Sequence, residues 1–408
     1  MGVKVAWSTR TMMSLALYTC FLWLLTSGLK TVQSLHDSHR GLAPTNVDFA
    51  FNMYRHLSTL DPHKNILISP VSVSMALAMM SLVAVGSKKN QFFQDVGFNL
   101  TEISKEEIYQ SFEKLSHLLS KADSSLEMRM GNTMFLDQSL NMRDSFLTDI
   151  EHYHESEALT TDFKDGADAR EHINRHVETK TQGEITHVFS DQDSPAPLTL
   201  VNYNVLKGMW ELPISPENTR DEDFHVSENS TVRVPMMFQS GVIGYLHDSE
   251  IPCQLVQMQY LKNGTTFFIL PDEGQMDAVT AALHRDTVER WDKLLTKRLV
   301  NLYIPRVYMS GTYNLEDVLE GMGITGLFTN QTDFLDISQD PPQKASKIVH
   351  KVMLQLDEKD EPPVTTTEAP PQTTSEPLTL TFNKPFIIMM FDSFTWSSLL
   401  LGKIMNPA

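Results

Sequence analysis

The spacing of apolar residues predicts a long helix that begins close to residue 45. Val47, Phe51 and Tyr54 recur at the four- and three-residue intervals of one helix face. The segment 45–48, Thr-Asn-Val-Asp, is typical of a helix start and contains the first of them, Val47.

A second helix is predicted to begin at Ser69 and Pro70. Serine is a capping residue, and proline favours the first helical position. An apolar run follows through Met80. Helical periodicity is present in three further ranges, 105–121, 143–156 and around 167–180.

The second half of the chain has a different pattern, with short apolar or alternating runs that are typical of strands. These runs are residues 198–205, 265–270, 300–304 and 378–382. Helices dominate the first half and strands the second, which favours one α+β domain. The sequence contains no internal repeat and no clear domain linker.

One segment is too polar to form part of a core. Residues 361–377 read EPPVTTTEAPPQTTSEP, with five prolines and five threonines. Such a composition predicts an exposed, extended segment whose threonines are candidates for O-glycans. Because apolar chain resumes on both sides, we expect an exposed loop inside a domain.

The N-terminal 34 residues have the pattern of a secretory signal peptide. Lys4 and Arg10 precede an apolar run at 12–25, and Val-Gln-Ser follows at 32–34. A membrane span is the alternative, but the run has about 14 residues and a span needs about 20. We therefore predict cleavage near Ser34, a mature domain at 35–408 and a secreted, extracellular protein.

Composition and charge agree with secretion. The net charge of −18 becomes −21 once the three bases of the leader are removed, because the leader contains no acid. A chain this acidic is not expected to bind nucleic acid or anionic membrane. Of two cysteines, Cys20 lies in the leader, so Cys253 is predicted to be a buried, inert thiol. The sequence also has four acceptor sites for N-linked glycans: Asn99, Asn229, Asn263 and Asn330.

We find no motif for catalysis, for a cofactor or for a metal. The sequence lacks G-x-S-x-G, H-E-x-x-H, C-x-x-C and a Walker lysine. A G-x-G-x-x-G match at 321–326 follows a helical pattern at 315–321 rather than a strand, so we interpret it as a chance turn. The protein is therefore expected not to be an enzyme.

Several segments resemble the serpin family over nearly all of the mature chain. They are residues 65–77 (second helix), 202–210 (a central strand ending in Trp210), 349–351 (approach to the reactive loop), and 382–386 with 406–407 (C-terminal signature). The resemblance implies a serpin fold: one α+β domain with three β-sheets, about nine helices and an exposed reactive-centre loop at 358–382. Segments 39–51, 245–258, 263–272 and 394–398 are more closely similar to the steroid-carrying branch of the family.

The predicted loop differs from that of an inhibitory serpin. Inhibition requires insertion of the cleaved loop into the central sheet, and inhibitors have a glycine, a threonine and a run of alanines at the hinge. Here the hinge reads Asp360, Glu361, Pro362, Pro363 and Val364. Proline has no amide hydrogen for a ladder, and an unpaired buried Glu361 would be costly. We expect no inhibition and weak coupling between loop cleavage and ligand release.

The resemblance implies a steroid pocket between two helices and a sheet. Trp396 would stack on the steroid, Gln257 would reach a polar end, Arg285 would close the pocket, and Phe391 would line its wall. The expected ligand is a glucocorticoid, cortisol or corticosterone, with progesterone as a further candidate.

Two positions of the pocket depart from the pattern of this branch. Glu289 stands in place of an asparagine, and Ser393 in place of a histidine. Glu289 also has a structural interpretation, as the last member of a capping box that begins at Asp286 or as an ion-pair partner of Arg285.

The expected partners are a steroid and a protease that cleaves the loop. The protein is predicted to circulate in plasma as a monomer, without a cofactor or a metal. A protease inhibitor, and a carrier of another lipophilic hormone such as thyroxine, remain as alternatives.

Overall fold

The computed structural model describes residues 42–82, 87–120, 126–140, 148–150, 156–208, 214–260, 264–324, 346–358, 376–393 and 395–408. The predicted signal peptide, the acceptor residues Asn263 and Asn330, the hinge residues 360–364 and most of the predicted helix at 143–156 lie outside these ranges.

Helices cluster in the N-terminal part of the chain, as predicted. Their bounds are α2 Ala43–Leu60, α3 Pro70–Met80, α4 Ser87–Asp95, α5 Lys105–Ser120, α7 Gly166–Lys180, α8 Met276–Ala282, α9 Arg285–Leu294 and α10 Leu315–Gly321. All eleven residues of α3 are buried, because its sequence is apolar on every side. Helix α2 begins two residues before the predicted start.

The prediction that Ser69 caps α3 is correct in position but wrong in its hydrogen bond. Ser69 is the N-cap residue, yet its side chain makes no capping bond. Its hydroxyl instead accepts a hydrogen bond from Asn204 Nδ2 at 2.6 Å. The serine therefore ties the start of α3 to a strand of the neighbouring sheet.

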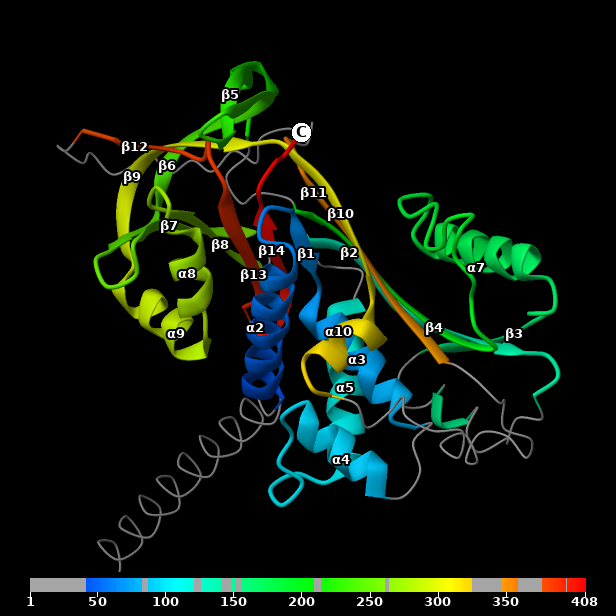
Figure 1. Cartoon of the computed structure of the whole chain (residues 1–408). Coiled ribbons are helices and arrows are strands. Elements are labelled where there is room, and N and C mark those ends of the chain that lie inside the picture. The colour runs from blue at the N-terminus through cyan, green and yellow to red at the C-terminus, as the bar shows by residue number, and fades with distance from the viewer. Residues whose placement is uncertain are drawn as a thin grey trace, which may run out of the picture.

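The smaller sheet has the strand order β10 (Val307–Asn314), β11 (Ser346–Leu356), β4 (Leu198–Gly208), β2 (Leu126–Asp137) and β3 (Glu157–Thr161). Strands β4 and β11 are parallel neighbours and pair from Ser346 opposite Leu198 to Gln355 opposite Lys207. Helix α7 covers one end of this sheet, well away from the other helices (Figure 1).

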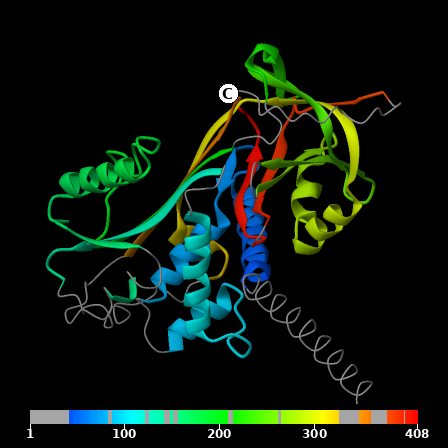
Figure 2. The same ribbon diagram turned by 180° about the vertical axis from the view of Figure 1, so that it is seen from behind.

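The larger sheet has the order β1 (Ile66–Ile68), β14 (Ser398–Ile404), β13 (Phe386–Asp392), β8 (Gly264–Pro271), β7 (Cys253–Tyr260), β6 (Ser230–Asp248), β9 (Thr296–Pro305) and β12 (Leu378–Thr381), and β5 (Arg220–Ser227) also pairs with β6. The described strands therefore form two hydrogen-bonded sheets where three were expected, because the 19 residues of β6 pair with β5, β7 and β9 and make one continuous network of them. Figure 2 shows the two networks from behind.

The interface between β4 and β11 contains a buried polar network. The amide of Ser69 donates to His350 Nε2 at 3.1 Å, so Nδ1 carries the proton and donates to Asn202 Oδ1 at 2.5 Å. Asn202 Nδ2 in turn donates to Ser72 Oγ at 2.6 Å. Burial lowers the pKa of His350 to about 3. The neutral imidazole thus links both strands to α3.

Candidate ligand pocket

One cavity of about 420 Å³ lies between α2, α9 and the end of β13. This volume is within the range of roughly 300–1,000 Å³ that is usual for small-molecule pockets. The lining residues come from α2, from α9, and from β13 and the turn after it: Pro44, Val47, Arg285, Val288, Glu289, Asp292, Lys293, Phe391 and Trp396. Four of the six predicted pocket residues therefore meet at one cavity.

Trp396 lies in a tight turn between β13 and β14. Its φ is +56°, a left-handed conformation that is uncommon for a residue with a bulky side chain. The turn is held by Asp392, whose carboxylate accepts from the amide and the hydroxyl of Thr395, each at 2.7 Å. The amide of Trp396 donates to the Asp392 carbonyl at 2.7 Å. The strained backbone fixes the position of the indole at the cavity.

Phe391 forms the floor beside this indole. It is 2% exposed, and its ring centroid lies 6.3 Å from that of Trp396 and 6.0 Å from that of Phe267. Edge and tilted ring contacts of this kind add to the stability of apolar packing. Phe391 therefore belongs both to the core and to the wall of the cavity.

Arg285 lies at the mouth of the cavity and pairs with acids on two helices. Its guanidinium is 3.6 Å from Asp48 of α2 and 4.0 Å from Asp286. The two predicted roles of Glu289 are not observed, because the N-cap of α9 is His284 and both ion pairs of Arg285 go to other acids. Glu289 instead lines the cavity as an exposed carboxylate.

Gln257 and Ser393, the other two predicted pocket residues, do not line the cavity. Gln257, on β7, donates through Nε2 to Asp292 Oδ1 at 3.1 Å. Ser393 Oγ shares a hydrogen bond of 2.7 Å with Thr265 Oγ1 on β8. Gln257 thus positions a lining residue, and Ser393 lies between Phe391 and the turn that carries Trp396.

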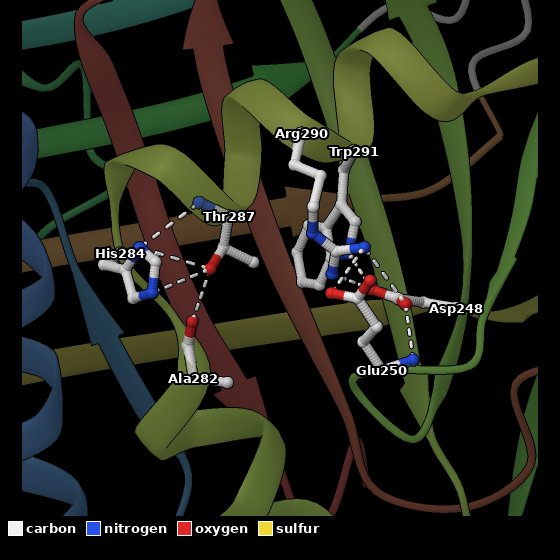
Figure 3. Close-up of polar contacts among 7 residues, drawn as sticks. All are labelled: Asp248, Glu250, Ala282, His284, Thr287, Arg290 and Trp291. Carbon is white, nitrogen blue, oxygen red and sulfur yellow. Dashed lines mark hydrogen bonds and ion pairs between the residues drawn. The ribbon is translucent and has the colours of Figure 1, made fainter.

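The contacts that hold α9 in place were not expected from the sequence. Asp248, at the end of β6, accepts hydrogen bonds from Trp291 Nε1 at 2.7 Å and from both terminal nitrogens of Arg290 (Figure 3). Burial alone would raise the pKa of Asp248, but these bonds outweigh burial and lower the pKa to about 2. Asp248 and Arg290 are far apart in sequence, so no local pattern relates them.

The base of the predicted reactive loop is anchored by an ion pair. The side chain of Glu358 is 2% exposed and accepts from Arg306 Nη2 at 2.6 Å, Arg306 Nε at 3.1 Å and Thr219 Oγ1 at 2.6 Å. Arg306 follows β9 directly, so the start of the loop is fixed to the larger sheet.

Two other cavities differ from the one beside Trp396 in their lining. These cavities, of about 380 and 630 Å³, include Asp48, Asp95 and His56 in one case and Glu102 and Glu107 in the other. They lack an aromatic wall comparable to Trp396 with Phe391.

The described part of the chain contains no cluster of histidine, cysteine and acidic residues suited to a metal. None of its helices is long and apolar enough to cross a membrane. Cys253 is free and buried, as predicted, and burial raises its pKa to about 12. The acceptor residues Asn99 and Asn229 are exposed.

The fold and the closed β4–β11 interface define a serpin. The sequence profile of that family, described as serpin (serine protease inhibitor), matches residues 44–407, and the chain belongs to this family. The expected serpin fold is thereby confirmed.

Among similar proteins, the corticosteroid-binding globulin of Rattus norvegicus is 60% identical over 400 residues, which are 97% of this chain and 100% of the relative. That of Homo sapiens is 56% identical over 404 residues, again 97% of this chain and 100% of the relative. Among solved structures, human thyroxine-binding globulin in complex with thyroxine has a TM-score of 0.83 at 35% identity and covers 91% of this chain and 100% of that chain.

Proposed function

We propose that this chain is a non-catalytic carrier of glucocorticoids such as cortisol and corticosterone, with progesterone as a further ligand. The observation that supports this most directly is the cavity beside Trp396 and Phe391. A steroid is a rigid apolar plate, and it needs a flat aromatic wall with a few polar groups at its ends. The identity of 56–60% to corticosteroid-binding globulins supports the same ligand class.

The charges of the lining favour an uncharged ligand. Arg285 and Lys293 are balanced by Glu289 and Asp292, and Arg285 has a further acid, Asp48, at 3.6 Å. A carboxylate such as that of thyroxine would have to compete with these acids for a cation. A neutral steroid makes no such demand, so the lining supports the steroid over the thyroid hormone.

The hinge sequence supports a carrier rather than an inhibitor. Pro362 and Pro363 follow the anchored Glu358 by four and five residues, and neither proline has an amide hydrogen for a central strand. Insertion would also have to separate β4 from β11 along ten paired positions. We infer that a protease can cleave the loop without being trapped.

The remaining parts of the proposal concern processing and circulation. We infer that residues 1–34 are removed as a signal peptide and that residues 35–408 circulate in plasma as a monomer. Asn99, Asn229, Asn263 and Asn330 are the proposed glycan sites. The exposure of Asn99 and Asn229 supports modification of these two.

The test is a binding panel on the secreted, glycosylated protein. Labelled cortisol, corticosterone and progesterone should bind at nanomolar to sub-micromolar concentration and quench the tryptophan fluorescence, and thyroxine should not compete. Trp396→Ala should abolish binding, whereas Tyr308→Ala, which removes another accessible aromatic ring on β10, should not. Absence of steroid binding at micromolar concentration would refute the proposal. A covalent complex with a serine protease would favour the inhibitor instead.

A further inference from the structure

Helix α9 supplies five of the nine lining residues, and its apolar contact with the core is made by Val288 and Trp291. Its sequence is RDTVERWDKL, with six charged residues, and only Thr287, Val288 and Trp291 are buried. A helix of ten residues is too short to be stable alone, since isolated helices need about 12–15 residues even with a good composition. The orientation of α9 must therefore be set by contacts to other elements.

The strongest of these contacts converge on the carboxylate of Asp248. This side chain is 3% exposed and lies at the end of β6, directly before the turn into β7. One oxygen accepts from Arg290 Nη1 at 3.2 Å and from the amide of Glu250 at 2.9 Å. The other accepts from Arg290 Nη2 and from Trp291 Nε1. Glu250 adds a second acid 3.6 Å from Arg290.

The two donors from α9 lie on the side of the helix opposite to the cavity. Successive residues of an α-helix are rotated by about 100°, so the lining residues of α9 span an arc of about 140° centred near Arg285 and Glu289. Arg290 and Trp291 lie outside this arc, one on each side of the opposite face. A carboxylate that binds both therefore resists rotation of the helix in either direction.

The N-terminal end of α9 is fixed separately. His284 is the N-cap residue, and its Nδ1 accepts from the amide of Thr287 at 3.2 Å. The hydroxyl of Thr287 donates to the carbonyl of Ala282 at 2.7 Å (Figure 3). This cap fixes where the helix begins but leaves its rotation to the contacts further along, which are the burial of Val288 and Trp291 and the hydrogen bonds to Asp248.

We propose that Asp248 is a positioning residue of the ligand pocket, which sets steroid affinity by fixing the rotation of α9 without touching the ligand. The proposal rests on the proposed function, because it assigns a role within the same site. The polar partners of Asp248 keep it ionised over the whole physiological range. The hydrogen bonds and the ion pair between Asp248 and α9 are therefore present throughout the physiological pH range.

The test compares four variants by cortisol binding and by hydrogen exchange of the segment 285–294. Asp248→Asn keeps the shape of the side chain but removes its charge, and Arg290→Met removes the charged donor. Asp223→Asn is the matched control, since Asp223 pairs with Arg233 at 3.3 Å on the β5–β6 hairpin and is exposed. Arg290→Lys tests whether charge alone can restore the effect.

Asp248→Asn and Arg290→Met should each weaken cortisol binding about 10-fold. This is the lower end of the loss in affinity that follows when a residue that holds a metal ligand in place is removed. The change should lie mainly in the dissociation rate. Amides of α9 should exchange faster while those of α3 and β4 are unchanged. Arg290→Lys should be intermediate, and Asp223→Asn should match the wild type.

Unchanged affinity in Asp248→Asn would overturn the proposal, as would faster exchange throughout both sheets, which would mean a general loss of stability. The exchange of α9 is measured without ligand. If the wild type binds no steroid, the proposed function fails, whereas unchanged α9 exchange in Asp248→Asn refutes the positioning role itself.

Discussion

The ion pair at the base of the loop allows a quantitative prediction. Replacing Arg306 by methionine would leave the carboxylate of Glu358 buried with Thr219 as its remaining side-chain partner. Breaking a fully buried pair typically costs about 3–5 kcal/mol. The side chain of Arg306 is 34% exposed, so solvent screens part of the interaction, and we expect a loss of about 2–3 kcal/mol.

This loss should depend on pH in a defined direction. Burial raises the pKa of Glu358, but the hydrogen bonds from Arg306 and Thr219 outweigh it, and the pKa lies below its ordinary value of 4.5. In the wild type the pair therefore stabilises the fold above about pH 4.5, and this contribution disappears as the pH falls through the lowered pKa. In Arg306→Met burial dominates and the pKa rises, so the penalty should shrink near pH 4.

The assay is urea unfolding at pH 7.5 and pH 4, supported by thermal scans. A loss of about 2–3 kcal/mol corresponds to a decrease of roughly 2–4 °C in melting temperature, because the unfolding entropy of a chain of this length is about 0.8 kcal/mol/K. The double variant Arg306→Met with Glu358→Met removes the lone charge and should recover most of the loss. If the double variant is as unstable as Arg306→Met alone, the loss does not come from a buried, unpaired carboxylate and the reasoning is wrong.

Three further predictions concern the network, the turn and the loop. Because burial lowers the pKa of His350 to about 3, the unfolding free energy should fall by about 1.6 kcal/mol between pH 6.5 and pH 5, and His350→Gln should remove this component of the slope; an equal slope in both proteins would contradict it. Asp392→Ala should release the turn of Trp396 and weaken cortisol binding about tenfold. It should also destabilise the fold by about 2 kcal/mol, because the carboxylate makes two partly buried bonds of about 1 kcal/mol each; titration with cortisol and thermal unfolding measure the two effects. Cleavage of the loop between 361 and 377 should raise the melting temperature by only about 1 °C, on the order of 1 kcal/mol of stabilisation, and leave cortisol bound. A rise of more than about 10 °C in calorimetry would show that the loop inserts.

Much of the fold could be predicted from local patterns, because several helices and strands carry the apolar spacing and the start signals of their type within their own residues. Helix α3 is apolar on every side and begins at the Ser-Pro pair, and the strand at 198–205 has apolar residues at five of its eight positions. Strand β2 was not predicted, because Arg129, Gly131 and Asn132 interrupt its apolar pattern. Asn132 is buried, and its side chain accepts a hydrogen bond from Asn202 at 2.7 Å. A buried polar network of this kind has no signature in a single strand.

Most residues that line the pocket could be predicted, but the contacts that hold its walls in place could not. Trp396 and Arg285 were expected from the family resemblance, since an isolated tryptophan or arginine carries no mark of a binding role. The prediction that α9 begins with a capping box at Asp286 is wrong, because His284 takes the cap with its ring nitrogen. The role of Asp248 could not be predicted, since its partners lie on another element and only the folded chain brings them together.

The arrangement of the larger sheet explains why cleavage of the loop and occupancy of the pocket can be independent. Strand β9 follows α9 after one residue, Leu295, and it pairs with β12, which follows the loop. The distal end of the loop is thus fixed to the same strand that leads out of the pocket wall. Its proximal end is fixed by Glu358 to Arg306, which follows β9. A cut between these anchors leaves both in place, so the forces that hold α9 against Asp248 are unchanged unless the cut segment can separate β4 from β11.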